Sequence, residues 1–233
     1  MKKLLFLGPK FHEKTKSSRF IIDLLAPFYE IKVVSIDTVK GAKDHDLSAY
    51  ATEDYDVLLC WQVMLTKYDL SYLSYQAGVF FPMYDGCPSP YKTEKWLYYK
   101  NFKIISFSRK LAGQLYRIGM DVEYIQYFPE PIQSSSSGDS KGIYFWNRRE
   151  EIGFDCLFSV IQNLNVDKVH VHRAMDPTQE FKSVDKQSNV SVTYSDWYEQ
   201  QEDMLTDVCK YAYYMAPRAK EGIGMSFLEA MAA

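Results

Sequence analysis

Residues 211–233 read YAYYMAPRAKEGIGMSFLEAMAA, and this stretch decides how the second half of the chain folds. The aromatic and apolar run at 211–216 predicts a buried strand. The loop that follows contains Gly222 and Gly224, and residues 225–232 begin a helix with apolar positions at helical spacing. A strand, a glycine-containing loop and a helix form the repeating element of a doubly wound α/β domain, whose ligands bind at the carboxyl ends of the strands.

The rest of the chain alternates strand-like and helix-like segments in the same way. Buried strands are expected at 3–8, 31–36, 56–61, 79–83, 103–107, 122–128, 142–146, 168–172 and 191–194. Helices are expected at 17–28, 70–76, 93–99, 109–118, 153–164 and 199–209. Strands separated by helices imply right-handed βαβ units and parallel sheets. The sequence therefore predicts an α/β protein with two Rossmann-like, doubly wound parallel-sheet domains.

The boundary between the two domains is expected at 133–142, a polar stretch without periodicity that reads as a linker. It separates an N-terminal, acceptor-side domain at 1–132 from a C-terminal domain at 143–233. The second domain has about four expected strands, whereas a full doubly wound domain has about six. Its last helix ends without a capping glycine or a following proline. We therefore expect an incomplete second domain, with an open sheet edge or an exposed helix face near 225–233.

Composition and charge narrow the classes of function. The 233 residues include 27 basic and 30 acidic side chains, a net charge of −3 that gives no support for a nucleic-acid partner. The apolar run in residues 1–8 is too short for a signal peptide, and no membrane-spanning segment is visible. The four cysteines are widely separated with no Cys-x-x-Cys pair. This spacing argues against a disulfide framework or a zinc site, and a reducing, cytoplasmic location is expected.

Two glutamates with seven residues between them, Glu221 and Glu229, carry the sharpest functional signal. The two glycines of the loop allow close backbone approach to a ligand, and the start of the helix offers unpaired N–H groups to a diphosphate. Glu229, one turn inside the helix, can accept charge-assisted hydrogen bonds from ribose hydroxyls. A surface glutamate on an ordinary helix is the alternative. The residues expected to bind a nucleotide here are Gly222, Gly224, Met225, Ser226 and Glu229.

This stretch resembles the E-x7-E motif of the family-4 retaining glycosyltransferases, which have the two-domain GT-B fold. The family's usual run, E-G-F-G followed by L-E-A-M-A, is matched at nearly every fixed position of 221–232. The resemblance implies that Glu221 contacts the donor sugar and that Glu229 contacts the ribose. It implies a metal-independent, hexosyltransferase-like enzyme without a cofactor. Such an enzyme moves sugar from a nucleotide-sugar donor to a saccharide or lipid-linked acceptor in bacterial cell-surface polysaccharide or glycolipid synthesis.

The resemblance continues, more weakly, at residues 146–153, WNRREEIG, which align with the family's G-R and K-G positions. There the arginine and the lysine neutralise the donor diphosphate. Arg148 fits the arginine, whereas Ile152 stands where the family has lysine. Arg149 is the candidate to supply the positive charge that the family's lysine would provide.

In the N-terminal domain, Tyr84 and Asp85 stand where related enzymes carry His-Asp facing the donor sugar. The resemblance implies a catalytic role for Asp85, and the alternative is a turn residue before a glycine. Tyr84 is an acceptor-side candidate, as are Lys10 and His12 of the loop after the first strand, for which solvated side chains are the alternative. His170 and His172 alternate on a strand and are expected to be structural.

Two further alternatives stay open. Residues 91–100 interleave aromatics with lysines, which fits either peripheral contact with the inner face of a membrane or a half-buried helix with solvated lysines. The departures at Ile152 and Tyr84, together with the expected truncation, also fit a non-catalytic sugar-nucleotide-binding or scaffold protein with a degenerate site. A fragment lacking part of the second domain would bind its donor incompletely and be inactive.

Overall fold

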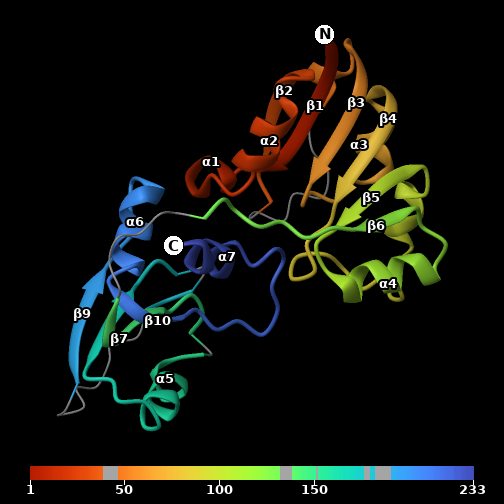
Figure 1. The fold of residues 1–233 in the computed structure, drawn as a ribbon. Helices are drawn as coiled ribbons and strands as arrows, with labels where there is room; N and C mark the ends of the chain where they lie inside the picture. Colours follow the sequence, from red (N-terminus) through yellow and green to blue (C-terminus); the bar gives the residue numbers. More distant parts are fainter. Residues whose placement is uncertain (39–46, 132–137, 151, 176–178, 182–189) are drawn as a thin grey trace. The chain divides into compact units, whose positions relative to one another are not determined.

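The computed structural model of the chain describes residues 1–38, 47–131, 138–150, 152–175, 179–181 and 190–233 (Figure 1). The chain divides into two compact units. Unit 1 comprises Met1–Tyr127 and Glu221–Ile223, and unit 2 comprises Phe128–Lys220 and Gly224–Ala233. Each unit is built on one parallel sheet with helices in the crossovers, so the predicted α/β class with two parallel sheets is confirmed.

Unit 1 holds a six-stranded parallel sheet in the order β2-β1-β3-β4-β5-β6. The strands are β1 (Lys2–Pro9), β2 (Tyr29–Ile36), β3 (Asp54–Trp61), β4 (Ser74–Phe81), β5 (Phe102–Ser106) and β6 (Val122–Tyr124). The helices are α1 (His12–Thr15), α2 (Arg19–Leu25), α3 (Lys67–Ser71) and α4 (Arg109–Arg117), with 3-10 helices η1 (Ser48–Tyr50) and η2 (Glu94–Tyr99). The strand order reverses between β1 and β3, and such a switch point opens a ligand crevice at the carboxyl ends of the strands.

The sheet of unit 1 is buried on both faces because successive side chains of a strand point in opposite directions. Leu5 and Leu7 of β1 enter a core that also contains Trp96 of η2 and Leu111 of α4. Leu4 and Phe6 enter the opposite core together with Ile21 of α2. The uninterrupted apolar run of β1 is therefore explained by its central position in a two-sided sheet.

Unit 2 holds a four-stranded parallel sheet in the order β10-β7-β8-β9. The strands are β7 (Asp139–Trp146), β8 (Lys168–His172), β9 (Ser191–Ser195) and β10 (Tyr211–Met215), and the helices are α5 (Phe154–Ile161), α6 (Gln201–Val208) and α7 (Met225–Ala232). One face is an apolar core that includes Ile143, Phe145, Leu157 and Val171. The order reverses between β10 and β7, so the crevice of this unit is expected where those two strands end.

The helix expected at 70–76 is wrong, and the helix expected at 93–99 is the 3-10 helix η2. Residues 70–76 do not form a helix: α3 ends at Ser71 and β4 begins at Ser74. The start of α3 is fixed by a capping box between Thr66 and Asp69, a signal that the sequence contained. Gly78 lies within β4, where a Cβ would come 2.7 Å from the ring of Phe102, so the close packing of this ring favours glycine.

Segment 91–100 is half-buried, as one of its two interpretations expected. Trp96 and Tyr99 of η2 are buried, whereas Leu97 and the neighbouring Lys95 and Lys100 are exposed. Residues 133–137 of the expected linker at 133–142 lie outside the described residues. Strand β7 begins at Asp139, earlier than the expected strand at 142–146.

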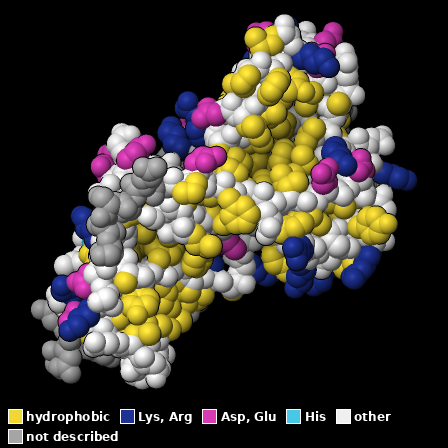
Figure 2. Space-filling view, in the orientation of Figure 1, with side chains coloured by type: hydrophobic (Ala, Val, Ile, Leu, Met, Phe, Trp, Pro, Cys, Tyr) yellow, Lys and Arg dark blue, Asp and Glu magenta, His cyan; other side chains and the backbone are white. Residues whose placement is uncertain are grey.

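The surface of the molecule carries apolar side chains in both units. In unit 1, Figure 2 shows hydrophobic side chains gathered over β1, β3 and β4 on the face in view. In unit 2, β10 is an edge strand, and Phe227 and Met231 of α7 are 39% and 78% exposed, as expected for residues 225–233. Within the described ranges, no helix has the length and hydropathy needed to cross a membrane.

Candidate functional site

The loop between β10 and α7 presents the start of α7 at the switch point of unit 2. Gly224 precedes the helix with φ of 80°, a left-handed conformation that glycine adopts without steric cost. Its carbonyl accepts hydrogen bonds from the amides of Phe227 and Leu228 at 2.9 and 3.1 Å, which closes the first turn. No side chain caps this end of α7. The N–H groups of Met225 and Ser226 therefore belong to the unpaired first turn of a helix that follows the edge of the sheet.

Glu229 lies one turn inside α7 and is half-buried. Gln201, the first residue of α6, donates a hydrogen bond from Nε2 to Glu229 Oε1 at 2.6 Å. Burial raises the pKa of Glu229 to about 7, against the opposing effects of the Gln201 hydrogen bond and of the positive charge of Arg148. The carboxylate is therefore held in a partly dehydrated position and is easily protonated near neutral pH.

Arg148 reaches the same region from the end of β7. Its guanidinium lies over the ring of Trp146, 4.9 Å from the ring centroid, and it acts electrostatically on Glu229. The residue before it, Asn147, is held by a hydrogen bond from its amide to the carbonyl of His172 at 3.2 Å. Arg148 and Glu229 therefore both lie at the switch point of unit 2, where the positive charge of Arg148 acts to lower the pKa of Glu229.

Two buried polar atoms accompany these charges. Asn147 is 3% exposed and Ser226 is 5% exposed. Within the described part of the chain, neither Asn147 Oδ1 nor Ser226 Oγ has a hydrogen-bond partner. Leaving such an atom unpaired costs about 1–3 kcal/mol, so buried orphans are uncommon in folded proteins. Their positions after β7 and in the first turn of α7 are suited to pairing with a polar ligand.

The remaining donor-side prediction is Arg149. This residue is half-buried, and its carbonyl accepts a hydrogen bond from the amide of Ile152 at 3.3 Å. The turn that it closes separates β7 from α5. In the resemblance to the family-4 glycosyltransferases Ile152 stands at the lysine position, and Arg148 and Arg149 are the basic residues of segment 146–153.

In unit 1, Asp85 lies in the turn that follows β4. The carbonyl of Met83 accepts hydrogen bonds from the amides of Gly86 and Cys87 at 3.1 and 2.9 Å. A Cβ added to Gly222 would lie 3.0 Å from Asp85 Oδ1 and 3.2 Å from Met83, so a side chain there would need these neighbours to shift by a few tenths of an ångström. Asp85 therefore lies close to Gly222, the residue after Glu221, within unit 1.

Tyr84, the other residue of this turn, contacts Lys110 of α4, whose Nζ lies 5.4 Å from the centroid of the tyrosine ring. The hydrogen bond to Tyr84 raises the pKa of Lys110. Tyr84 also packs against the core on the α4 face. Its ring therefore has a structural role in addition to its position at the carboxyl end of β4.

His12 lies at the switch point of unit 1. It is 8% exposed, so the alternative of a solvated histidine is wrong, whereas Lys10 is exposed. Burial lowers the pKa of His12 to about 4, opposed by a hydrogen bond with Gln62. Gln62 follows β3 and has φ of 61°, which is uncommon for a residue other than glycine. Gln62 is not among the residues predicted from the sequence, because its contact with His12 joins residues that are distant in the chain.

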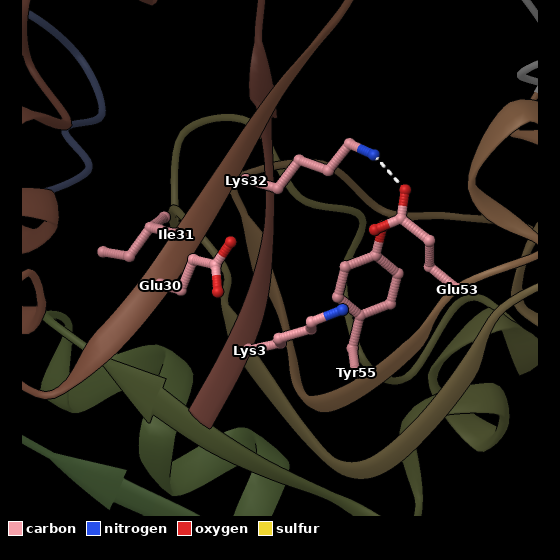
Figure 3. A pocket seen from close by; sticks show the side chains of 6 residues that line it. All are labelled: Lys3, Glu30, Ile31, Lys32, Glu53 and Tyr55. Atoms are coloured by element: carbon pink, nitrogen blue, oxygen red, sulfur yellow. Dashed lines mark hydrogen bonds and ion pairs between the residues drawn. The ribbon is translucent and has the colours of Figure 1, made fainter. Parts of the chain in front are cut away.

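A cavity of about 300 Å³ lies at the opposite edge of the same sheet (Figure 3). Its walls are Lys3, Glu30, Ile31, Lys32, Glu53 and Tyr55, from the amino-terminal part of β1, from β2 and from β3 with the residue before it. Lys32 and Glu53 form an ion pair across it. None of the site residues predicted from the sequence lines this cavity. The charges of its two basic and two acidic side chains cancel.

The described residues contain no group of three or more His, Cys, Asp or Glu side chains that could hold a metal ion. No model of a known protein family matches the chain, and no curated protein matches it significantly.

Proposed function

We propose that unit 2 binds the nucleoside diphosphate part of a nucleotide sugar, and that the chain is a glycosyltransferase of the GT-B kind. The observation that carries the proposal is the convergence of Glu229, Arg148 and the uncapped start of α7 where β7 and β10 end. These groups come from segments far apart in the sequence. They combine an acceptor for hydroxyl groups with a cation and helix N–H groups for phosphate.

Each group suits one part of such a ligand. The first-turn amides of α7 and the hydroxyl of Ser226 can donate hydrogen bonds to phosphate oxygens. Arg148 can neutralise the diphosphate, and its contact with Trp146 limits the positions of the guanidinium. The ionised carboxylate of Glu229 can accept from ribose hydroxyls. The site therefore matches a ribose linked to a diphosphate better than a free sugar or a peptide.

Sugar transfer from such a donor requires stabilisation of charge on the departing diphosphate. Fixed N–H groups and Arg148 supply this electrostatic stabilisation without a metal ion. The resemblance assigns contact with the donor sugar to Glu221 and adds Asp85 as the second catalytic candidate. Lys10 and His12 are proposed for the acceptor, which we propose to be a saccharide or a lipid-linked sugar.

The proposal is tested by a thermal-shift screen against UDP, GDP, ADP and dTDP and their sugars, because ligands of the native state raise the melting temperature. We expect the nucleotides of one nucleobase to raise the melting temperature. Addition of EDTA should leave this increase unchanged. Glu229→Ala should weaken that ligand about tenfold or more, since a charged hydrogen bond contributes roughly 1.5–3 kcal/mol. The matched control is Glu202→Ala, an exposed carboxylate on α6. A flat screen, or equal effects of the two substitutions, would reject the nucleotide site.

A non-catalytic sugar-nucleotide-binding protein is the second candidate. Tyr84 favours it, because a tyrosine replaces the family's histidine and is tied to Lys110 and to the core. Its hydroxyl is a poor general base near neutral pH. Incubation with the preferred nucleotide sugar separates the two functions. Release of nucleoside diphosphate in the presence of a saccharide or lipid-linked acceptor supports the transferase, and binding without release supports the second candidate.

A further inference from the structure

The contact between α6 and α7 holds one oxygen of the carboxylate that the proposed function assigns to ribose. Gln201 Nε2 donates to Glu229 Oε1 at 2.6 Å. Gln201 is exposed and Glu229 is half-buried, so the hydrogen bond lies at the rim of the site. Among the described residues, no hydrogen bond engages Oε2. An amide that occupies one oxygen orients the carboxylate and leaves the other oxygen for a ligand.

We infer that Gln201 is a positioning residue for nucleotide binding, which keeps Glu229 oriented and ionised so that ribose hydroxyls can be bound by its second oxygen. The inference rests on the proposed function and extends it to a residue outside the motif. A glutamine suits this role because its amide donates a hydrogen bond without adding a charge that would compete with the diphosphate. A lysine or arginine in its place would neutralise Glu229 rather than leave it available.

Proton coupling follows from the same arrangement. Burial opposes ionisation of Glu229, whereas Gln201 and Arg148 favour it, and these are the groups that act on the carboxylate from α6 and from the end of β7. A ribose that donates hydrogen bonds also favours the ionised form. Nucleotide binding near neutral pH should therefore release part of a proton, and affinity should rise between pH 6 and pH 8.

The test compares Gln201→Met, which keeps the side-chain length but removes the donor, with Gln200→Met as the matched control. Gln200 is the exposed neighbour and its side chain does not cap α6. The titration of Glu229 is followed by carboxyl-carbon NMR without ligand, with Glu229→Gln to assign the signal. Calorimetry with the nucleoside diphosphate that binds best is then repeated at pH 6, 7 and 8.5, with the fold checked by the amide spectrum.

We expect Gln201→Met to raise the pKa of Glu229 and to weaken binding at pH 7 by about three- to tenfold, with a smaller loss at pH 8.5. Gln201→Lys, which restores a donor, should return the titration of Glu229 to the wild-type range or below it. Gln200→Met should match the wild type. The inference is overturned if Gln201→Met and Gln200→Met titrate alike and bind alike. If the wild type binds no nucleoside diphosphate, the proposed function fails, whereas a shifted Glu229 titration would still show the pairing.

Discussion

Among single residues, Glu229 combines a proposed ligand role with an unfavourable environment in the unliganded fold. Its pKa is about 7 in the fold and 4.5 without it, so the unfolded chain binds fewer protons between these pH values. The stability contributed by the neutral carboxyl is therefore present below pH 4.5 and is lost as the pH rises through 7. A residue that weakens the fold at working pH is typical of a binding site.

Glu229→Gln should therefore stabilise the protein at pH 8 by about 1–2 kcal/mol, after a discount for partial solvent screening, and have little effect at pH 4.5. Urea unfolding at both pH values measures the difference. Glu202→Gln, at an exposed position on α6, should change neither value. Equal stability of wild type and Glu229→Gln at pH 8 would contradict the buried position of this carboxyl.

The sequence revealed the motif residues but not their partners. Glu221, Glu229 and Arg148 were predicted because they belong to short patterns with fixed spacing. Gln201 and Gln62 were missed because their roles come from tertiary contacts, with α7 and with His12 respectively. Such contacts depend on which elements pack together, and no local pattern of residue types encodes that.

At the scale of elements, the start of α7 depends on the left-handed backbone of Gly224. Gly224→Ala should cost about 1–2 kcal/mol, because a Cβ clashes with the backbone in that conformation. Gly113→Ala in α4 is the matched control, since a Cβ there has no neighbour within 4 Å, and it should stabilise by about 0.5–1 kcal/mol. Thermal unfolding of both variants measures the contrast. If both substitutions changed the free energy of unfolding in the same direction, this account of the start of α7 would be contradicted.

Strand β8 carries a buried polar network on the face of the unit 2 sheet that is opposite the apolar core. His170 Nε2 and His172 Nδ1 lie 2.8 and 2.9 Å from Ser195 Oγ, and His170 also faces Asp207 of α6 at 3.5 Å. The ring of His172 stacks on Tyr198. The two histidines are therefore structural, and each has a hydrogen-bond partner in the fold.

This network predicts a loss of stability in acid. Burial lowers the pKa of His172 from 6.5 to about 4, so the unfolded state binds more protons between those values. Its contribution is present above pH 6.5 and is lost as the pH falls toward 4, by about 2–3 kcal/mol for this 1% exposed side chain. His172→Gln should flatten that part of the pH profile of urea unfolding, whereas Asp203→Asn, at an exposed position on α6, should not. A profile for His172→Gln as steep as that of the wild type would refute the assignment.

Secondary structure was predicted correctly where a continuous apolar run marked a buried strand and wrongly at residues 70–76. The continuous apolar runs of β1 and β8 predicted buried strands correctly. The helix predicted at 70–76 rested on apolar spacing alone, whereas the capping box at Thr66 and Asp69 starts α3 earlier and the helix ends at Ser71. Ser74 belongs to β4, where its hydroxyl donates to Asp54 of β3 at 2.6 Å. That partner on β3 is distant in sequence, as are the residues of β3 with which β4 pairs in parallel.

For the molecule as a whole, the number of parallel sheets was predictable, whereas the strand order was not. The alternation of strands and helices implied two doubly wound units, because parallel strands need crossovers. The placement of β10 beside β7 rather than β9 follows from tertiary packing. That placement creates the switch point of unit 2 and brings the end of β7 next to the loop before α7. The candidate site therefore depends on a topological feature that lies beyond local sequence patterns.

The location of the nucleotide site is tested most directly by amide chemical-shift mapping with the nucleoside diphosphate that gives the largest thermal shift. The proposed site predicts the largest changes at residues 147–149, at 224–229 and at Gln201. The residues around the cavity of Figure 3 should stay unchanged. Perturbations centred on Lys3, Lys32 and Glu53, or no perturbation at millimolar ligand, would contradict nucleotide binding at the switch point of unit 2.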